Sequence, residues 1–190
     1  GWFYDDPKNP NDVKIIPLQQ TSSDILGLNF KELIPKLKLG YERPIEEKYV
    51  CISIQSTSQA KYWNCKGGWQ KVVDYFKNEI LFVQATYKNC EILDGVINFD
   101  LNFRDACSLM NLCDFYLGWE GGFSHAAAAL NKKAVVLFGG YIHPQTTGYN
   151  LHENIYIDVE GSPCGMRKYC KHCEKCRKLI TVKKVIEKVK

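Results

Sequence analysis

A carboxylate, a glycine pair and an imidazole lie within six residues at the start of EGGFSHAAAALNKKAVVLFGG, residues 120–140. Glu120 follows an apolar segment, and His125 stands near the start of an Ala-rich segment of helical type. The first N–H groups of a helix lack intrahelical acceptors and attract anions, and Gly121 and Gly122 would let a phosphate come close. Glu120 would repel a diphosphate but can accept hydrogen bonds from sugar or ribose hydroxyls, while His125 can donate to a phosphate or sugar oxygen. The stretch predicts a site for a phosphorylated sugar; the alternative is a tight turn beside a buried structural histidine.

A second polar loop, QSTSQAKYWN, follows another apolar segment. Ser56 and Thr57 supply hydroxyls, and Lys61 supplies a compact ammonium, which together suit a diphosphate. The loop lacks the Walker spacing G-x-x-x-x-G-K-[ST], and no G-x-G-x-x-G follows the first predicted strand, which disfavours a nicotinamide cofactor. By itself the loop is a weak signal, and it gains weight if it faces Glu120 across one edge of a sheet.

Four cysteines lie within thirteen residues, in CGMRKYCKHCEKC. Four thiolates suit a structural zinc or iron ion, and nearby Lys and Arg lower thiol pKa values. The usual zinc pattern keeps two C-x2-C pairs farther apart, and the sequence of a bacterial iron–sulfur cluster is incomplete here. We expect a structural metal, with free or disulfide-prone thiols as the alternative, at four residues: Cys164, Cys170, Cys173 and Cys176.

The remaining composition bounds the class of protein. Five further cysteines are scattered, several in apolar segments, and the odd total of nine favours a reducing compartment. No apolar run reaches the roughly 18–20 residues that span a membrane, and the start shows no signal-peptide pattern. The sequence therefore predicts a soluble, cytoplasmic chain with one sizeable core.

Strand-like and helix-like segments alternate along most of the chain. Predicted strands lie at 49–55, 80–86, 95–99, 114–119, 133–139 and 154–159, and predicted helices at 68–78, 104–113, 123–131 and 181–190. The alternation predicts an α/β, Rossmann-like parallel sheet with helices on both faces. Such sheets bind ligands outside the carboxyl ends of their strands, which selects residues 56–61, 84–91, 120–125 and 139–147.

The ends of the chain differ from its middle. Residues 1–48 read as a linker or edge segment with short helical turns, 164–176 as the cysteine cluster, and 177–190 as a basic amphipathic helix. Residues 167–190 hold ten Lys/Arg and two Glu, a net charge of +8, against −4 for the rest of the chain. This charge fits either a solvated face or a patch for an acidic partner.

The combination resembles the C-terminal, donor-binding half of glycosyltransferase family nine, the ADP-heptose:lipopolysaccharide heptosyltransferases. That family shows an acid, Gly and His before an Ala-rich helix, then an apolar strand and a Phe-Gly turn with a Pro-containing loop. Here the matching segments are EGGFSHAAAALNKKAVVLFGG and HPQTTGY. STSQAKYW is similar to the family's Thr-Thr…Lys-x-Trp loop, and SPCGMRKYC to its Ser-Pro-Cys segment. The similarity runs over about residues 50–178 and is most specific over 120–140.

The resemblance implies that residues 49–163 are the nucleotide-sugar-binding half of a two-domain GT-B fold. Glu120 stands where the family usually has Asp, which points to a different sugar. Seven residues match donor-binding positions: Ser56, Thr57 and Lys61 for the diphosphate, Glu120 for the donor sugar, and Gly121, Gly122 and His125 for the rest of the pocket.

The resemblance also implies partners. The family's N-terminal domain, which binds the acceptor and supplies the general base, has no counterpart in residues 1–48, so we expect this chain to bind donor and to need that domain for turnover. An ADP-sugar is the favoured donor, a glycan or lipid-linked molecule the acceptor, and lipopolysaccharide or another surface glycan the product. No cofactor is expected to be required for catalysis. The basic tail suggests a peripheral position at the inner membrane.

Two other classes of function remain open from the residues alone. The cysteines and the basic tail could form a metal-bearing module that docks nucleic acid, with binding that weakens steeply as salt rises. The cysteines could also form a redox module without nucleotide affinity. Neither alternative needs the two polar loops on a common rim, which favours the glycosyltransferase interpretation.

Overall fold

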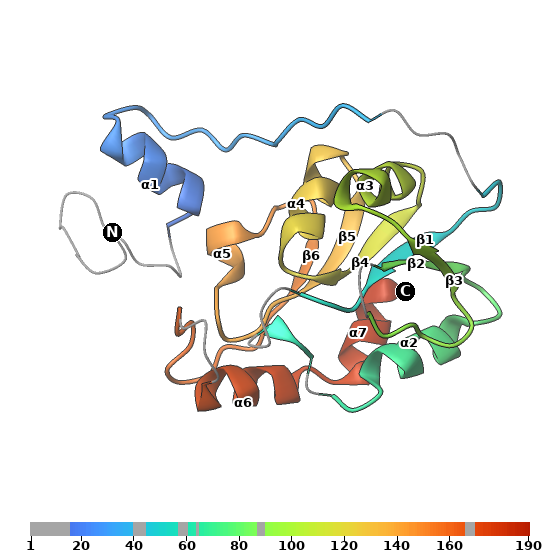
Figure 1. The fold of residues 1–190 in the computed structure, drawn as a ribbon. Coiled ribbons are helices and arrows are strands. Elements are labelled where there is room, and N and C mark those ends of the chain that lie inside the picture. The colour runs from blue at the N-terminus through green and yellow to red at the C-terminus, as the bar shows by residue number, and fades with distance from the viewer. Residues whose placement is uncertain (1–15, 40–44, 57–60, 64, 87–89, 166–169) are drawn as a thin grey trace.

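Six parallel strands form one sheet in the order β3-β2-β1-β4-β5-β6 (Figure 1). The computed structural model describes residues 16–39, 45–56, 61–63, 65–86, 90–165 and 170–190. The predicted α/β class with an all-parallel, Rossmann-like sheet is confirmed. The strands are β1 Val50–Ser53, β2 Phe82–Thr86, β3 Ile97–Asp100, β4 Phe115–Trp119, β5 Lys133–Leu137 and β6 Glu153–Ile155.

Helices cover both faces of this sheet. α2 and α7 pack together on one face, and α3 and α4 pack together on the other (Figure 1). The helices are α1 Leu18–Ile25, α2 Gly68–Phe76, α3 Phe103–Asn111, α4 Gly122–Ala129, α5 Pro144–Thr147, α6 Lys171–Leu179 and α7 Val182–Val189.

The strand residues alternate between two hydrophobic clusters because successive side chains of a strand point to opposite faces. Val50 and Ile52 of β1 join the cluster under α2 and α7, which also contains three tryptophans. Cys51 joins the opposite cluster, with Tyr116 of β4 and the alanines of α4. The sheet is covered on both faces, which explains why its central strands are continuous apolar runs in the sequence.

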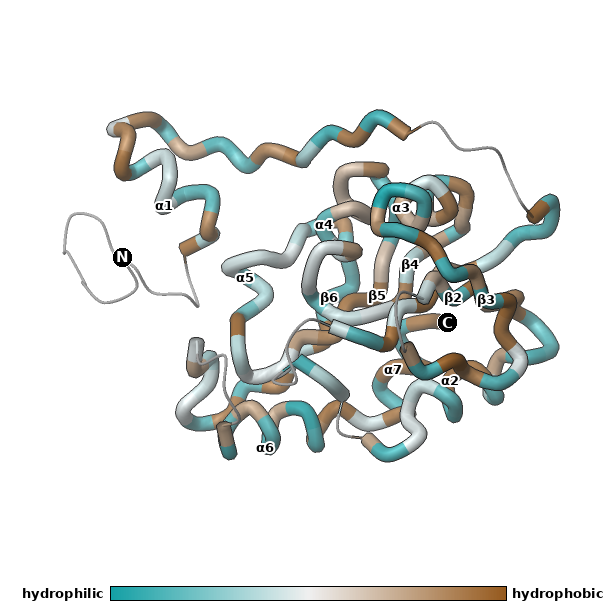
Figure 2. The backbone as a smooth tube through the Cα atoms, viewed as in Figure 1, coloured by the Kyte–Doolittle hydropathy of each residue, from teal (hydrophilic) through white to brown (hydrophobic). Residues whose placement is uncertain are grey.

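Two helices were not predicted from the sequence. α5 is one turn that begins at Pro144, and α6 spans the last cysteines, so the expected boundary at residue 177 falls inside a helix. Figure 2 shows that α6 is mostly hydrophilic, and its apolar periodicity is weak for this reason. Within the described residues, no helix has the length and apolarity needed to cross a bilayer.

The segment before β1 contains more structure than a linker would. α1 lies in it, followed by an extended stretch that runs past the sheet (Figure 1). The Gln19 side chain forms two hydrogen bonds with the backbone of Leu33, at 2.8 and 2.9 Å, which tie α1 to the extended stretch.

Candidate functional site

The polar loops meet where the strand order reverses. β1 pairs with β2 on one side and with β4 on the other, so the connections that leave β1 and β4 go to opposite faces of the sheet. In sheets of this type the divergence opens a crevice at the carboxyl ends of the strands. The loop after β1 carries Ser56, and the loop after β4 carries Glu120, so the sequence placed both on the correct edge.

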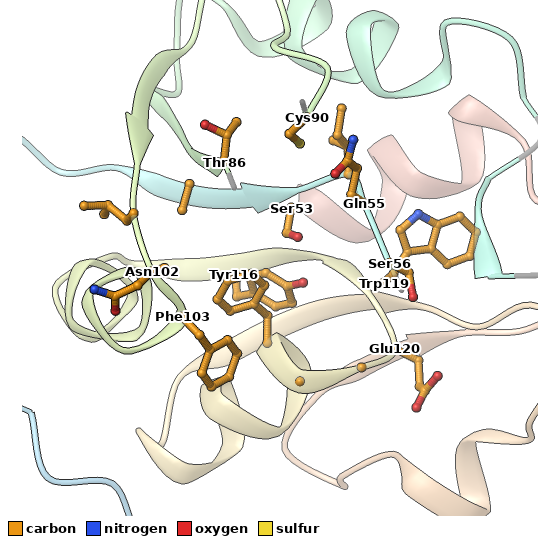
Figure 3. A pocket seen from close by; sticks show the side chains of 17 residues that line it. Ser53, Gln55, Ser56, Thr86, Cys90, Asn102, Phe103, Tyr116, Trp119 and Glu120 are labelled. Atoms are coloured by element: carbon orange, nitrogen blue, oxygen red, sulfur yellow. The ribbon is translucent and has the colours of Figure 1, made fainter. Parts of the chain in front are cut away.

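A cavity of about 510 Å³ occupies this crevice (Figure 3). Its polar wall comes from the ends of β1 and β4, and its apolar wall comes largely from the start of α3 and from α4. Phe103 and Phe123 stack there with ring centroids 5.1 Å apart. The lining residues are Ser53, Ile54, Gln55, Ser56, Ala85, Thr86, Cys90, Leu101, Asn102, Phe103, Ala106, Tyr116, Trp119, Glu120, Gly121, Gly122 and Phe123.

Lys61 and Glu120 form a buried ion pair at the rim of this cavity. The Lys61 ammonium lies 2.6 Å from Glu120 Oε2, and the side chains are 18% and 7% exposed. The Thr147 hydroxyl donates to Glu120 Oε1 at 3.4 Å, and the Lys61 ammonium also lies 5.3 Å from the centre of the Tyr141 ring. The two loops are therefore linked by opposite charges in a place of low water access, where their attraction is larger than in water but is offset by the cost of desolvating both groups.

Gly121 joins Glu120 to the start of α4 in a conformation that favours glycine. Gly121 has φ 156° and ψ −159°, a region that residues with a side chain rarely adopt. The Ser124 hydroxyl accepts a hydrogen bond from the Gly121 amide at 3.1 Å and donates to its carbonyl at 2.8 Å. The amides of Gly122 and Phe123 belong to the first turn, where helical N–H groups have no acceptor within the helix.

His125 lies one turn into α4 and contacts a buried tyrosine. Its Nδ1 is 2.9 Å from the Tyr149 hydroxyl. Burial lowers the pKa of His125, Glu120 acts in the opposite direction, and Lys61 lowers it further. Tyr149 also packs edge-on against His152, whose pKa burial lowers to about 4. Both histidines are therefore held in their neutral forms near pH 7.

A second cavity, of about 340 Å³, is lined by Thr147, whose hydroxyl contacts Glu120 of the first cavity. His125 lines this cavity, together with α5 and its neighbours, and the segment around α1 closes part of it. Its walls are rich in amide, hydroxyl and aromatic side chains: Gln19, Phe30, His125, His143, Gln145, Thr146, Thr147, Tyr149, Asn150 and Asn154.

The structure thus arranges the sequence-predicted donor residues around two adjacent cavities. Ser56, Glu120 and the glycine pair line the first, Lys61 joins Glu120 at its rim, and His125 lines the second. Thr57 lies outside the described residues. Sequence reasoning missed Tyr149 and Thr147, although both occur in the quoted segment HPQTTGY. It also missed Trp119, which immediately precedes Glu120 and lines the first cavity.

Three of the four clustered cysteines come together. The Sγ atoms of Cys164, Cys170 and Cys173 lie within 4.8 Å of one another, and those of Cys164 and Cys173 are 2.9 Å apart. Gly140 permits this arrangement, because a side chain there would come within 2.9 Å of the Cys173 backbone. Burial raises the pKa of Cys173, whereas hydrogen bonds from the backbone amides of Cys173 and His172 lower that of Cys170.

Cys176 points elsewhere. Its thiol donates to the carbonyl of Ile157 at 3.0 Å, and it is not part of the three-thiol group. Cys176 lies about 9 Å along α6 from Cys170, and its side chain is turned towards the Ile157 carbonyl, which leaves its sulfur outside the group.

The basic tail is partly neutralised by local ion pairs. Lys178 pairs with Glu174 within α6, and Lys183 pairs with Glu187 within α7. Lys188 reaches Glu153 at 2.7 Å, an acid outside the tail. Glu174 and Glu187 are already counted in the net charge of +8, and Glu153 is the additional acid, so most of the positive charge of the tail remains.

Comparison with known proteins adds a family relationship to this geometry. Residues 17–175 match the sequence model of Glycosyltransferase family 9 (heptosyltransferase). The chain is 32% identical over 162 residues to the autotransporter heptosyltransferase Aah of Escherichia coli, which covers 78% of this chain and 41% of that protein. It is 34% identical over 215 residues to lipooligosaccharide heptosyltransferase 2 of Campylobacter jejuni serotype O:2, which covers 100% of this chain and 66% of that protein.

Solved structures share the fold. The iron-containing dodecameric glycosyltransferase TibC from enterotoxigenic E. coli superposes with a TM-score of 0.79 at 24% identity, over 100% of this chain and 57% of that chain. TibC in complex with ADP-D-beta-D-heptose gives a TM-score of 0.76 at 23% identity, over 92% of this chain and 52% of that chain. The chain spans about two fifths of the length of the E. coli autotransporter heptosyltransferases that it matches.

Proposed function

Because the chain belongs to glycosyltransferase family 9, the heptosyltransferase family, we propose that it binds the nucleotide-sugar donor of a glycosyl transfer reaction. One observation carries this proposal. A cavity at the reversal point of a parallel sheet has a lysine–glutamate pair and a glycine-bearing helix start on its rim. These groups match the two chemically different parts of a nucleotide sugar, an anionic diphosphate and a hydroxyl-rich ring.

The lining of the first cavity suits a nucleoside diphosphate. Its apolar wall, with Leu101 and Phe103, offers a surface for a base, since aromatic faces stack well on bases. The diphosphate would lie near Ser56, Lys61 and the first amides of α4, where positive charge and unpaired donors gather. The volume of about 510 Å³ is in the usual range of small-molecule sites.

The sugar would then lie at Glu120, between the two cavities. A carboxylate accepts hydrogen bonds from two neighbouring hydroxyls, and the amides and hydroxyls of the second cavity continue this pattern. The related TibC structure contains ADP-D-beta-D-heptose, which supports an ADP-heptose-like donor for this chain as well.

The transfer itself requires stabilisation of the leaving diphosphate while an acceptor hydroxyl attacks the anomeric carbon. Lys61 and the α4 amides are positioned for the first task, because they meet the charge that develops on the departing phosphate. We assign the acceptor, a glycan or lipid-linked molecule, and the general base to a second domain of the GT-B type. On this account the product is a surface glycan such as lipopolysaccharide, and transfer takes place on the cytoplasmic side of the inner membrane.

We also propose a structural metal ion at the cysteine group. Three thiol sulfurs within 4.8 Å of one another are a soft donor set suited to iron or zinc, and the related TibC is described as iron-containing. Cys164, Cys170 and Cys173 would hold the ion, and Cys176 would join only after its side chain turns away from Ile157. Such an ion would fasten the start of α6 to the loop that contains Cys164.

Amide chemical-shift mapping tests the donor site directly. Addition of ADP to ¹⁵N-labelled protein should shift the amide resonances of Gly121, Gly122 and Phe123 more than those of α7. Shifts confined to the basic helices α6 and α7 would instead indicate nonspecific anion binding and would contradict the proposed site.

A further inference from the structure

Tyr149 lines the second cavity beside His125, and its hydroxyl contacts the ring of that histidine. Its side chain is buried, and its hydroxyl is 2.9 Å from His125 Nδ1. The two residues are 24 positions apart, on α4 and on the loop after α5. Such a contact can decide which nitrogen of the imidazole carries the proton, and therefore what the ring offers to a ligand.

The direction of this hydrogen bond follows from the needs of the tyrosine. Burial raises the pKa of Tyr149, and the negative charge of Glu32 raises it further, so the phenol keeps its proton. A buried O–H group requires an acceptor. Among the described residues, His125 Nδ1 is the hydrogen-bond partner of this hydroxyl, and donation from the tyrosine to Nδ1 gives the O–H group its acceptor.

A neutral imidazole that accepts at Nδ1 carries its proton on Nε2. Burial lowers the pKa of His125, which keeps the ring neutral and makes the choice of tautomer matter near pH 7. The ring then presents one N–H donor and no second acceptor. This form suits an anionic or hydroxyl oxygen of a donor, and it does not suit a general base.

The loop that carries Tyr149 is firmly held. Asn154 Nδ2 donates to the Tyr149 carbonyl at 3.1 Å, and the His152 ring packs edge-on against the phenol with centroids 5.5 Å apart. The Gly148 amide donates to the Pro144 carbonyl at 2.7 Å, where a side chain at Gly148 would collide with that carbonyl. The hydroxyl is thus presented to His125 by a preformed turn.

We propose that Tyr149 is a positioning residue that fixes His125 as the Nε2–H tautomer, so that His125 donates a hydrogen bond to the diphosphate or sugar of the nucleotide-sugar donor. This role rests on the proposed function for its ligand. The tautomer itself is a property of the chain alone. A nucleotide sugar gains from such pre-orientation because no reorganisation of the ring is needed when it binds.

The first test is ¹⁵N NMR of histidine-labelled protein near pH 7.5, without ligand. In the wild type, His125 Nδ1 should resonate as an unprotonated nitrogen and Nε2 as a protonated one. Tyr149→Phe removes only the hydroxyl and should produce a mixture of tautomers at His125. A protonated Nδ1 in the wild type, or an unchanged tautomer in Tyr149→Phe, would overturn the proposal.

The second test is ADP-heptose affinity by calorimetry, because His125 lines the cavity proposed for the sugar. Tyr149→Phe should weaken binding about three- to tenfold, the usual range for one hydrogen bond. On a His125→Gln background, whose amide N–H needs no tautomer, the same change should alter affinity less than about twofold. Tyr49→Phe is the matched control, because Tyr49 also loses one buried hydroxyl bond, to the Leu109 carbonyl at 2.7 Å, away from both cavities.

The outcomes separate the two proposals. If wild-type protein binds no nucleotide, the proposed function fails, while the wild-type NMR spectrum still decides the tautomer. If ADP-heptose binds but Tyr149→Phe and Tyr49→Phe bind it equally well, the positioning role fails and the donor site stands. If Tyr149→Phe does not fold, the Nδ1 resonance of the wild type alone supports or overturns the assigned tautomer.

Discussion

The ammonium of Lys61 lies 2.6 Å from a carboxylate oxygen of Glu120, across the crevice between the loops that follow β1 and β4. The group assigned to phosphate and the group assigned to sugar are therefore paired with each other. A donor that engages both would replace this pair with two new contacts, the diphosphate at Lys61 and the sugar hydroxyls at Glu120. Because each residue would contact a different part of the donor, mutation of each should affect a different part of the binding energy.

Replacing Lys61 by alanine should weaken ADP binding roughly 10- to 100-fold, the range for a hydrogen bond to a charged group. The loss has two sources: the ammonium disappears, and the unpaired Glu120 carboxylate repels the diphosphate. Calorimetric titration checks this expectation. Lys183→Ala, on an 87% exposed lysine of α7, provides the control and should bind as the wild type does. Equal affinities in both variants would remove Lys61 from the phosphate site.

Replacing Glu120 by glutamine should separate the sugar from the phosphate. The amide keeps the size of the side chain and removes its charge, so Lys61 becomes free to meet the diphosphate. We expect ADP affinity to stay the same or rise, while the additional affinity of ADP-heptose over ADP falls about tenfold. The comparison requires both ligands on both proteins. An undiminished preference for ADP-heptose in Glu120→Gln would assign the sugar to other residues.

Stability should fall at mildly acidic pH because of His152. Its folded-state pKa is about 4, whereas an unfolded histidine titrates near 6.5, so between these values the unfolded chain binds more protons. Stability therefore rises with pH across this window and is lost as pH falls from about 6.5 towards 4, by roughly 3 kcal/mol for this residue. Urea unfolding at several pH values measures the slope.

The variant His152→Phe isolates this contribution. It retains a ring against Tyr149 but cannot titrate, so its stability should depend less on pH over the same interval. Carboxyl groups are present in both proteins, and the difference between the two curves isolates His152 together with its electrostatic interaction with His125. Parallel curves for wild type and His152→Phe would show that His152 is not held neutral.

The proposed metal ion should stabilise the junction between α6 and the loop at Cys164. Anaerobic addition of iron(II) or zinc to reduced, metal-free protein should raise the melting temperature by several degrees, because an ion bound only to the folded state adds its binding free energy. Cys173→Ser should abolish the rise, and Cys65→Ser, which changes a thiol outside the group, should preserve it. The same melting temperature with metal and with chelator would contradict the metal site.

Most of the fold follows from the sequence because the central strands β1, β4 and β5 are apolar on both sides. The stretches at β1, β4 and β5 are short apolar runs separated by helical periodicity, and this pattern leaves few arrangements besides a parallel sheet. The edge that carries the site follows as well, since the carboxyl ends of parallel strands lie together. Ser56 and Glu120 were therefore predictable as neighbours from the order of elements alone.

The finer geometry depends on contacts that no local pattern encodes. Tyr149 meets His125 because of how the turn after α5 packs on α4, and a single tyrosine in a loop carries no signal of that role. α6 was missed because six of its nine residues are charged or His and few are apolar, and the orientation of the Cys176 side chain towards Ile157 is a tertiary contact that the cysteine spacing does not show. Residues whose role depends on tertiary packing, such as Tyr149, could not be predicted from the sequence.

The central claim is that the crevice between β1 and β4 binds a nucleotide sugar. Calorimetric titration of the chain with ADP, UDP and GDP, and then with ADP-heptose, tests it most directly. The account predicts selective binding of ADP and tighter binding of ADP-heptose, both only weakly dependent on salt. A folded sample that binds none of these ligands would contradict the claim, and Glu120 to His125 would then be a structural turn.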